Sequence, residues 1–201
     1  MSTPRLIVLA TANRGKALEL EALAAALPVR VALLSELAGP VETSEPFGTF
    51  HENARRKAHV AARLTGEWAL GEDSGLAVDA LSGRPGVYSA RFAGPGQPDA
   101  QRVALLLEML EGVPTDRRGA RFHCALCLAG PEGVLGEWAG VCEGRIANEA
   151  RGSGGFGFDP VFVAGGQSLT SAELTPDEKN ALSHRGIAMR RFVADLPPLL
   201  A

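Results

Sequence analysis

The sequence predicts an α/β protein built on a mixed β-sheet. Near the N-terminus, the aliphatic strand-like residues 5–10 precede residues 15–27, where apolar side chains recur at helical spacing. In the second half, residues 119–129 and 134–142 have the composition of strands, and the turn sequence Gly130-Pro131-Glu132-Gly133 joins them into a hairpin. Strand–helix units favour parallel pairing and a hairpin requires antiparallel pairing, so one sheet containing both is mixed.

Other elements of the first half follow from similar signals. Residues 29–34 are predicted to form a second strand. The alanine-rich residues 49–64 are predicted to form a helix with its alanines inward and most of its arginines outward. Two short strands are expected at 67–71 and 76–80, separated by a turn at "EDSG".

The second half begins with "SGRPGVYSARFAGPGQPD", which is too rich in glycine and proline for regular structure. Asp99 is then expected to cap a helix over 100–111. A short strand is predicted at 161–163. The last helix is predicted over 175–195, because Thr175-Pro176-Asp177-Glu178 places a cap residue, a proline and an acid in the order typical of a helix start.

The composition is that of a globular protein, and the length allows one large domain or two small lobes around a shared core, without a separate linker. The chain has 201 residues, of which 46% are hydrophobic and 21% charged, with a formal net charge of −3. Its cations are spread along the chain, which argues against nucleic-acid binding. No apolar stretch is long enough for a membrane span, and the N-terminus lacks the apolar core of a signal peptide. We therefore expect a cytoplasmic protein.

The three cysteines do not form a predicted redox or zinc site. Cys124 and Cys127 have CxxC spacing, but they lie in a predicted strand, where side chains three positions apart point to opposite faces. Cys142 is isolated. Buried cysteines in a reducing compartment are the simplest interpretation.

"LATANRGKALEL" resembles a phosphate-binding loop only in part. A P-loop requires glycine where Ala10 stands and a hydroxyl residue where Ala17 stands. What remains is a strand, a polar turn with Thr11 and Asn13, and Lys16 in the first helical turn. A lysine is unfavourable at the positive end of a helix, so a bound anion would explain it. A solvated lysine remains the alternative.

"GEDSGLAVDAL" places two acids side by side between apolar residues. Adjacent carboxylates such as Glu72 and Asp73 repel each other unless a cation lies nearby. Oxygen ligands of this kind suit Mg²⁺, which commonly takes one or two carboxylates together with substrate phosphates. An ordinary polar turn is the alternative.

Two further motifs contain aromatic and cationic side chains. In "SGGFGFDPVF", clustered glycines permit close approach of a ligand, and Phe156 and Phe158 could stack on a planar ring. In "EKNALSHRG", Lys179, Ser183 and His184 can gather near one helix start, and Arg185 forms a pair of donors with His184. Each motif also has a purely structural interpretation. Together, the motifs provide the cations, carboxylates and aromatic faces that a nucleoside triphosphate with Mg²⁺ requires.

These motifs occur in an order that resembles the inosine triphosphate pyrophosphatase family. The matching segments span nearly the whole chain and are "TANRGK", "FHENARRKA", "EDSGLAVDALSGRPGVYSARFAG", "GGFGFDPVF" and "LTPDEKNALSHRGIAMRRF". The resemblance implies an elongated mixed sheet flanked by helices, in a single domain over 1–201 with two lobes around a central nucleotide-binding cleft. It also implies a homodimer that uses Mg²⁺ to hydrolyse ITP, dITP and XTP to the monophosphate and pyrophosphate.

The resemblance also assigns roles to individual residues. Asp73 corresponds to the catalytic carboxylate and a metal ligand, and Lys16 to a catalytic phosphate ligand. Glu45 and Glu72 are the other metal candidates, with Glu42 a possible substitute for Glu45. The triphosphate is assigned to Thr11, Ala12, Asn13, Arg14, Gly15 and Lys16, with Ser74 also on the substrate. The base is assigned to Phe156, Gly157, Phe158, Asp159, Lys179, His184 and Arg185.

A mechanism follows from these assignments. Asp73 would orient or deprotonate the water that attacks the α-phosphorus, and Lys16 would stabilise charge on the leaving pyrophosphate. Donors from His184 and Arg185 would satisfy the 6-keto oxygen of hypoxanthine or xanthine and oppose the amino group of adenine. A pyrophosphatase for modified pyrimidine nucleotides and a nucleotide sensor without turnover remain alternative functions.

Overall fold

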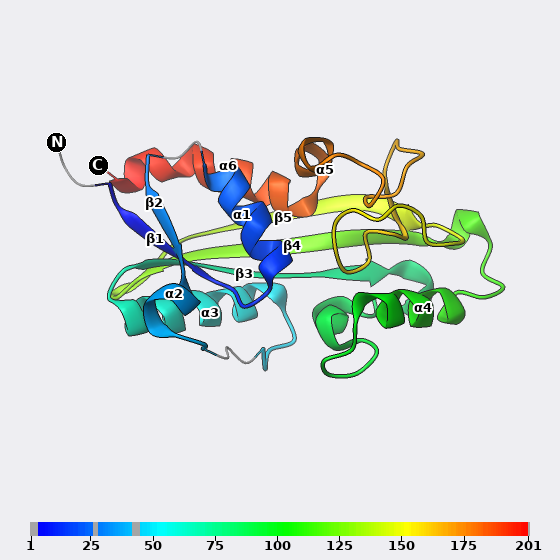
Figure 1. The fold of residues 1–201 in the computed structure, drawn as a ribbon, viewed down its shortest axis with the longest axis horizontal. Helices are drawn as coiled ribbons and strands as arrows, with labels where there is room; N and C mark the ends of the chain where they lie inside the picture. The colour runs from blue at the N-terminus through cyan, green and yellow to red at the C-terminus, as the bar shows by residue number, and fades with distance from the viewer. Residues whose placement is uncertain (1–3, 26–27, 42–44, 201) are drawn as a thin grey trace. The chain divides into compact units, whose positions relative to one another are not determined.

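The protein contains one mixed β-sheet of six strands in the order β2-β1-β3-β4-β5-β6 (Figure 1). The structure is a computed structural model that describes residues 4–25, 28–41 and 45–200. β1 pairs in parallel with β2 and β3, and β5 pairs antiparallel with β6, so the predicted mixed sheet is confirmed. The strands are β1 Leu6–Ala10, β2 Arg30–Leu33, β3 Trp68–Val78, β4 Gly119–Gly130, β5 Gly133–Ile146 and β6 Phe162–Ala164.

The helices complete the chain in two compact units. The α-helices are α1 Arg14–Ala24, α2 Leu34–Ala38, α3 Phe50–Thr65, α4 Asp99–Met109, α5 Pro176–Leu182 and α6 His184–Leu200. Three 3₁₀ turns are η1 Asp79–Leu81, η2 Gly86–Arg91 and η3 Thr115–Arg117. The first unit comprises Met1–Asp73, Cys124–Gly140 and Arg185–Ala201, and the second comprises Ser74–His123 and Val141–His184. β3, β4 and β5 contribute residues to both units.

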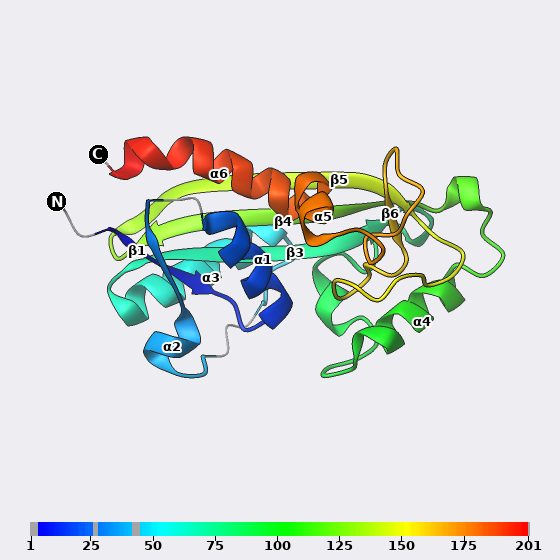
Figure 2. The same cartoon turned by 45° about the horizontal axis from the view of Figure 1, so that its top comes forward.

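In the first unit, helices cover both faces of the sheet (Figures 1 and 2). The alternation of side chains along each strand produces two separate cores. Ile7, Leu9 and Leu70 pack with residues of α1 and α6. Val8 and Ala69 lie in the opposite core with the alanines of α3. Strands buried on both faces explain why β1 has a continuous apolar sequence.

The cysteines of β4 lie in these two cores. Cys124 belongs to the core beneath α1 and α6, and Cys127 to the core beneath α3, so their thiols point apart as predicted. Burial raises the pKa of the Cys124 thiol well above its usual value and that of Cys127 to about 12. Both thiols are therefore protonated and unreactive near neutral pH.

The second unit has its own hydrophobic core. Residues of β3, β4, β5 and β6 pack there against α4, where Leu106 and the C-cap residue Leu110 are fully buried. Phe158 also lies in this core and meets the ring of Phe92 edge to face, with 6.2 Å between centroids. Phe162 contacts the ring of Phe122 in the same manner, at 4.6 Å.

The largest difference from the predicted elements is in β3. The turn expected at "EDSG" is absent, and the two predicted strands form one continuous strand, Trp68–Val78. The acids, serine and glycine favour a turn when only local sequence is considered. Here the carboxylates of Glu72 and Asp73 instead lie within the strand, each beside cationic side chains from neighbouring helices.

The predicted C-terminal helix is also different. It consists of α5 and α6, separated at Ser183, whose backbone is extended (φ −68°, ψ 154°). The Ser183 N–H still donates to the Lys179 carbonyl at 2.8 Å, so the first helix ends normally before the chain changes direction. α6 then continues beyond the predicted end at Asp195, to Leu200.

Smaller differences concern helix starts. The predicted strand 29–34 gives way after Leu33 to the unexpected helix α2, in which the Glu36 carboxylate accepts from the Leu33 N–H at 3.0 Å. Asp99 is the first residue of α4 and not its cap. The predicted helix 15–27 appears as α1, and residues 26–27 lie outside the described residues.

One glycine controls how closely β3 approaches α3. A Cβ atom added to Gly71 would lie 2.1 Å from the Ala54 carbonyl oxygen and 2.6 Å from the Ala58 nitrogen. Both are backbone atoms, which cannot move aside without displacing the helix. Glycine in the strand and alanine in the helix therefore permit the short separation that this packing requires.

We expect Gly71→Ala to destabilise the protein by about 1–3 kcal/mol or more, because the new methyl group overlaps the backbone of α3. Gly48→Ala is the matched control, since a Cβ there meets nothing within 4 Å. Urea unfolding of both variants measures the difference. Equal stability of the two variants would show that the close packing is not required.

Candidate functional site

The start of α1 forms a positively charged end of the first unit. The side chain of Asn13 caps the helix, with its Oδ1 accepting from the Lys16 N–H at 3.1 Å. The Thr11 hydroxyl accepts from the Asn13 N–H at 3.1 Å and fixes the preceding turn. The first helical turn contains Arg14 and Lys16 and no acid. The helix dipole and two cations together favour an anion here.

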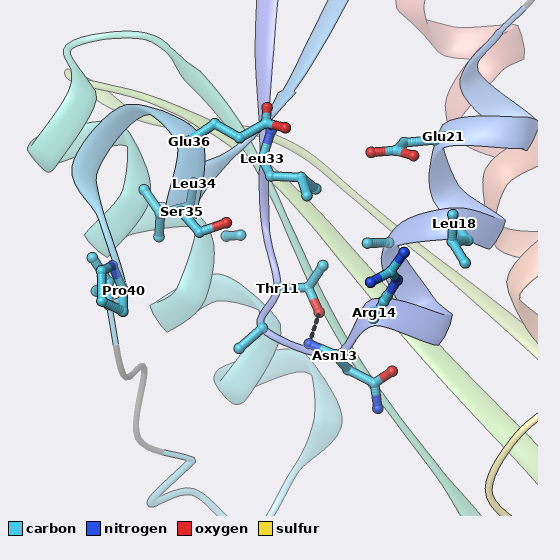
Figure 3. Close-up of a pocket in the computed structure, with 14 residues that line it drawn as sticks. Thr11, Asn13, Arg14, Leu18, Glu21, Leu33, Leu34, Ser35, Glu36 and Pro40 are labelled. Carbon is cyan, nitrogen blue, oxygen red and sulfur yellow. Dashed lines mark hydrogen bonds between the residues drawn. The ribbon is translucent and has the colours of Figure 1, made fainter.

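A cavity of about 870 Å³ adjoins this loop (Figure 3). Thr11, Asn13 and Arg14 line one side of it, and Ser35 and Glu36 of α2 line another. The cavity lies within the first unit and is large enough for a polyphosphate or another small molecule.

Glu72 and Asp73 lie on opposite faces of β3. Adjacent side chains of a strand alternate, so Glu72 points with Leu70 toward α1 and α6, and Asp73 points with Gly71 toward α3. Both residues are buried, with 1% and 2% of their surfaces exposed. The two acids therefore belong to different sets of contacts and do not form a side-by-side pair.

Glu72 is held by cations from two helices. Its Oε2 lies 2.9 Å from Lys16 Nζ, and its Oε1 accepts from Arg185 Nη2 at 3.0 Å. Arg185 also donates to Glu19, which lies one turn after Lys16 on α1. Burial raises the pKa of Glu72, but the charges of Lys16 and Arg185 outweigh it and hold that pKa well below its usual value. This chain of alternating charges connects α1, β3 and α6.

Asp73 is held by α3. Lys57 Nζ donates to Asp73 Oδ1 at 2.9 Å and to Glu45 Oε1 at 2.5 Å, so one ammonium group joins the two carboxylates. Asn53 Nδ2 donates to Asp73 Oδ2 at 3.1 Å. Burial, with a contribution from the charge of Glu45, raises the pKa of Asp73 despite Lys57 and Lys16. The pKa of Glu45 is lowered, because Lys57 outweighs the opposing effect of burial.

Asn53 and Lys57 were missed as site residues, although both lie in the motif "FHENARRKA". Their positions relative to the inward-facing alanines of the helix could have identified them. Lys57 follows the inward Ala54 by three positions and precedes the inward Ala61 by four, so it belongs to the buried face of the helix. A lysine there requires a buried anionic partner.

Glu45 and Asp73 are two carboxylates of the first unit that could hold a metal ion, because both contact the Lys57 ammonium group. Across the part of the chain that the structure describes, no group of three or more His, Cys, Asp or Glu side chains could hold a metal. Two carboxylates around a common cation nevertheless fit Mg²⁺, which often takes its other ligands from water and phosphate. Glu72 lies on the other face of β3, and Glu42 lies outside the described residues.

The predicted base-binding residues, except Arg185, lie in the second unit. Lys179 Nζ contacts Asp159 Oδ2 at 2.5 Å and lies 4.8 Å from the centre of the Phe156 ring. His184 stacks on Phe122, with 4.7 Å between the ring centres. Phe158 packs in the core, with 3% of its surface exposed, so Phe156 is the more accessible aromatic face.

Arg185 belongs to the first unit, although His184 directly precedes it. Its guanidinium is buried between Glu72 and Glu19. The extended backbone at Ser183 ends α5, and α6 begins at His184. His184 and Arg185 therefore lie in a different helix from Lys179. Ser74, the other predicted substrate residue, follows Asp73 in β3 and lies in the second unit.

The fold and the site define an α/β protein with a cationic helix start, two carboxylates that share one lysine, and a glycine-rich loop beside a second lysine and an aromatic ring. The sequence profile of the Ham1 family matches residues 7–195. The chain belongs to the Ham1 family. None of the described helices is long and apolar enough to cross a membrane.

Similar proteins cover nearly the whole chain. A dITP/XTP pyrophosphatase of Desulforamulus reducens is 49% identical over 92% of each chain. Another from Geobacillus kaustophilus is 47% identical over 92% of this chain and 91% of its own. A HAM1 protein from Coxiella burnetii has a similar structure, with a TM-score of 0.86 and 42% identity over 96% of this chain and 98% of its own. These relatives confirm the family that the sequence motifs indicated.

We expect Glu72→Gln to reduce stability by about 3–5 kcal/mol at neutral pH, since it removes the carboxylate paired with Lys16 and one of the two carboxylates paired with Arg185. The pKa of Glu72 is lower in the folded protein than in the unfolded chain. The ionised carboxylate therefore contributes fully to the free energy of unfolding above the ordinary carboxyl pKa of about 4.3. This contribution is lost as the pH falls through the lowered pKa of the folded protein. The difference from the wild type should therefore narrow in acid.

Urea unfolding at neutral pH and at the lowest pH where both proteins remain folded measures this change. Glu132→Gln, in the exposed turn of the β4–β5 hairpin, is the control and should alter stability by less than about 0.5 kcal/mol. A loss of the same size at both pH values would contradict an ionised, ion-paired Glu72.

Proposed function

We propose that this protein hydrolyses the non-canonical purine nucleotides ITP, dITP and XTP to the nucleoside monophosphate and pyrophosphate. This activity would remove deaminated purines from the nucleotide pool before they enter DNA or RNA. The names of the similar proteins support the reaction. The observation that carries the proposal is the arrangement of the cationic start of α1 in one unit with the buried Asp73, which Lys57 and Asn53 hold in place.

Mg²⁺ is the proposed cofactor, with Asp73 and Glu45 as its protein ligands. When bound, the ion supplies charge neutralisation to the phosphates and lowers the pKa of water. The closeness of the two carboxylates supports this assignment, because their mutual repulsion is relieved by added positive charge. Glu72 is less suited to the ion, because Lys16 and Arg185 already neutralise it.

Asp73 is the proposed proton acceptor for the attacking water. A carboxylate with a raised pKa is a stronger base than an ordinary aspartate. Lys57 and Asn53 each donate to one of its oxygens, which fixes the plane of the carboxylate and therefore the direction in which it accepts a proton. Attack of this water on the α-phosphorus breaks the bond to the β-phosphate bridging oxygen and releases pyrophosphate.

Lys16 is proposed to stabilise the negative charge of that leaving group. The rest of the Thr11–Lys16 loop would contact the triphosphate through backbone N–H groups and the Arg14 side chain. Glu72 and Arg185 would hold Lys16 in place through the ion pairs described above. This assignment gives Arg185 a supporting role in the first unit and differs from the base contact that the motif alone suggested.

Base recognition is proposed for the second unit. Phe156 offers a ring face, Lys179 and His184 offer donors to a 6-keto oxygen, and the backbone of Gly157 can approach a ligand closely. Ser74 is assigned to the substrate on its position after Asp73. We also propose that the protein acts as a cytoplasmic homodimer.

The first test is an assay of the purified protein with Mg²⁺ and separate solutions of dITP, XTP, dATP, dGTP and dUTP. We expect monophosphate and pyrophosphate from dITP and XTP, and little product from the others. Identification of the products by ion-exchange chromatography distinguishes pyrophosphate from orthophosphate. Orthophosphate as the primary product, or a preference for dUTP, would overturn the proposed reaction.

The second test removes the proposed base. Asp73→Asn should lower kcat at least about 100-fold, because an amide cannot accept the proton. Binding of dITP by this variant should remain measurable by calorimetry. Asp116→Asn, in the exposed η3 turn, is the control and should retain wild-type turnover. Wild-type kcat in Asp73→Asn would remove Asp73 from the mechanism.

A further inference from the structure

The segment "SGRPGVYSARFAGPGQPD" has no role in the nucleotide site described so far, yet it reaches the glycine loop through its last residue, Asp99. The glycine loop, residues 152–157, has three residues with left-handed backbone: Gly152, Gly155 and Gly157 have φ of +79°, +68° and +62°. Glycine adopts this conformation without strain but also has many other conformations available. A loop of this kind needs external contacts to hold one shape.

Three hydrogen bonds from loop N–H groups fix the glycine loop. The Gly154 N–H donates to the Ala172 carbonyl at 3.0 Å, and the Phe156 N–H donates to Asp159 Oδ2 at 2.8 Å. The Gly157 N–H donates to Asp99 Oδ2 at 2.6 Å. The last acceptor is a side chain that lies 58 positions away in the sequence. It holds Gly157, the residue between Phe156 and Phe158.

Asp99 is itself fixed by Arg102 of the same helix. The other carboxylate oxygen of Asp99 contacts Arg102 Nη2. Nη1 of that guanidinium donates to the carbonyls of Ala90 at 3.1 Å and Gln97 at 2.5 Å. The preceding segment is thereby fastened to the start of α4, with Asp99 directed at Gly157. This explains why Asp99 does not cap the helix as its sequence position predicted.

A second contact connects the same two segments. Phe92 of the glycine- and proline-rich segment meets Phe158 edge to face, one residue beyond Gly157. The loop backbone is therefore held by Asp99 and the following side chain by Phe92. Directly before these two points, the ring of Phe156 lies 4.8 Å from Lys179 Nζ, beside the proposed base-recognition residues of the second unit.

We propose that Asp99 is a positioning residue for nucleobase recognition, acting through the Gly157 N–H to fix the Phe156 ring. This inference rests on the proposed function, because it assigns base binding to the glycine loop. Asp99 does not contact the reacting phosphates in this scheme. Without Asp99, the glycine loop would have to become ordered when the substrate binds, and this ordering would reduce the binding free energy. Loss of Asp99 should therefore weaken substrate binding and purine discrimination. The chemical step should remain nearly unchanged.

A purely structural role predicts a different result. An acid in the first turn stabilises a helix through the dipole, so removal of Asp99 could simply loosen α4. In that case amide hydrogen exchange would accelerate in residues 100–109 and stay unchanged in the glycine loop. KM for the substrate would not change.

The experiment compares the wild type with Asp99→Ala, Asp99→Asn and the control Asp116→Ala. The Asp99 side chain is 41% exposed, so these variants are expected to fold. Steady-state kinetics with dITP and dATP separates KM from kcat. Hydrogen exchange followed by mass spectrometry on a peptide containing Gly157 reports the order of the loop without any substrate.

We expect Asp99→Ala to raise KM for dITP about tenfold with kcat within about twofold, which corresponds to one charge-assisted hydrogen bond. Its preference for dITP over dATP should fall, and the Gly157 peptide should exchange faster. Asp99→Asn keeps an oxygen acceptor and should recover part of each effect. Asp116→Ala should match the wild type.

Unchanged KM and unchanged exchange of the Gly157 peptide in Asp99→Ala would overturn the inference, as would faster exchange confined to α4. The proposed function fails separately, when the wild type itself does not release pyrophosphate from dITP. In that event the hydrogen-exchange comparison still decides whether Asp99 orders the loop.

Discussion

The structure depends above all on the burial of two neighbouring carboxylates in β3. An ionised carboxylate loses several kcal/mol of hydration when it is buried, and it is tolerated only beside cations and hydrogen-bond donors. Since Glu72 and Asp73 point to opposite faces, each needs its own cation. Lys16 and Arg185 supply the charge on one face, and Lys57 supplies it on the other. Three helices are thereby fixed against one strand.

This requirement explains the small residues on the α3 side. The backbone of α3 lies so close to β3 that Gly71 has no room for a side chain. At this distance Lys57 reaches Asp73, Glu45 and the Glu72 carbonyl oxygen, which lies 3.0 Å from its Nζ. The alanine-rich face of α3 thus has a function beyond core packing. It brings an ammonium group to the proposed catalytic carboxylate, and Asn53 on the same face fixes the second oxygen.

The sequence predicted those parts of the fold whose signals are periodic and local. The first strand and helix, the alanine-rich helix and the β4–β5 hairpin all have a regular apolar pattern or a strong turn. β3 was misread because "EDSG" has turn residues, and the cations that keep it extended come from distant segments. Lys57 was overlooked for the same reason, because the role of a lysine among alanines depends on ion-pair partners that lie elsewhere in the sequence. Asp99 was assigned to a cap because its actual partner, Gly157, is remote in sequence.

Two motifs include points where the chain passes from one compact unit to the other. The first segment of the first unit ends at Asp73 and its last segment begins at Arg185, while Ser74 and His184 belong to the second unit. Residues adjacent in these motifs therefore serve different sets of partners, as His184 on Phe122 and Arg185 on Glu72 illustrate. A short motif is usually interpreted as one cluster of side chains. In "EDSG", the alternation of side chains along β3 directs neighbouring residues to opposite faces. In "EKNALSHRG", the helix break at Ser183 divides the motif between α5 and α6. The residues of each motif must therefore be assigned by the face and unit to which they belong.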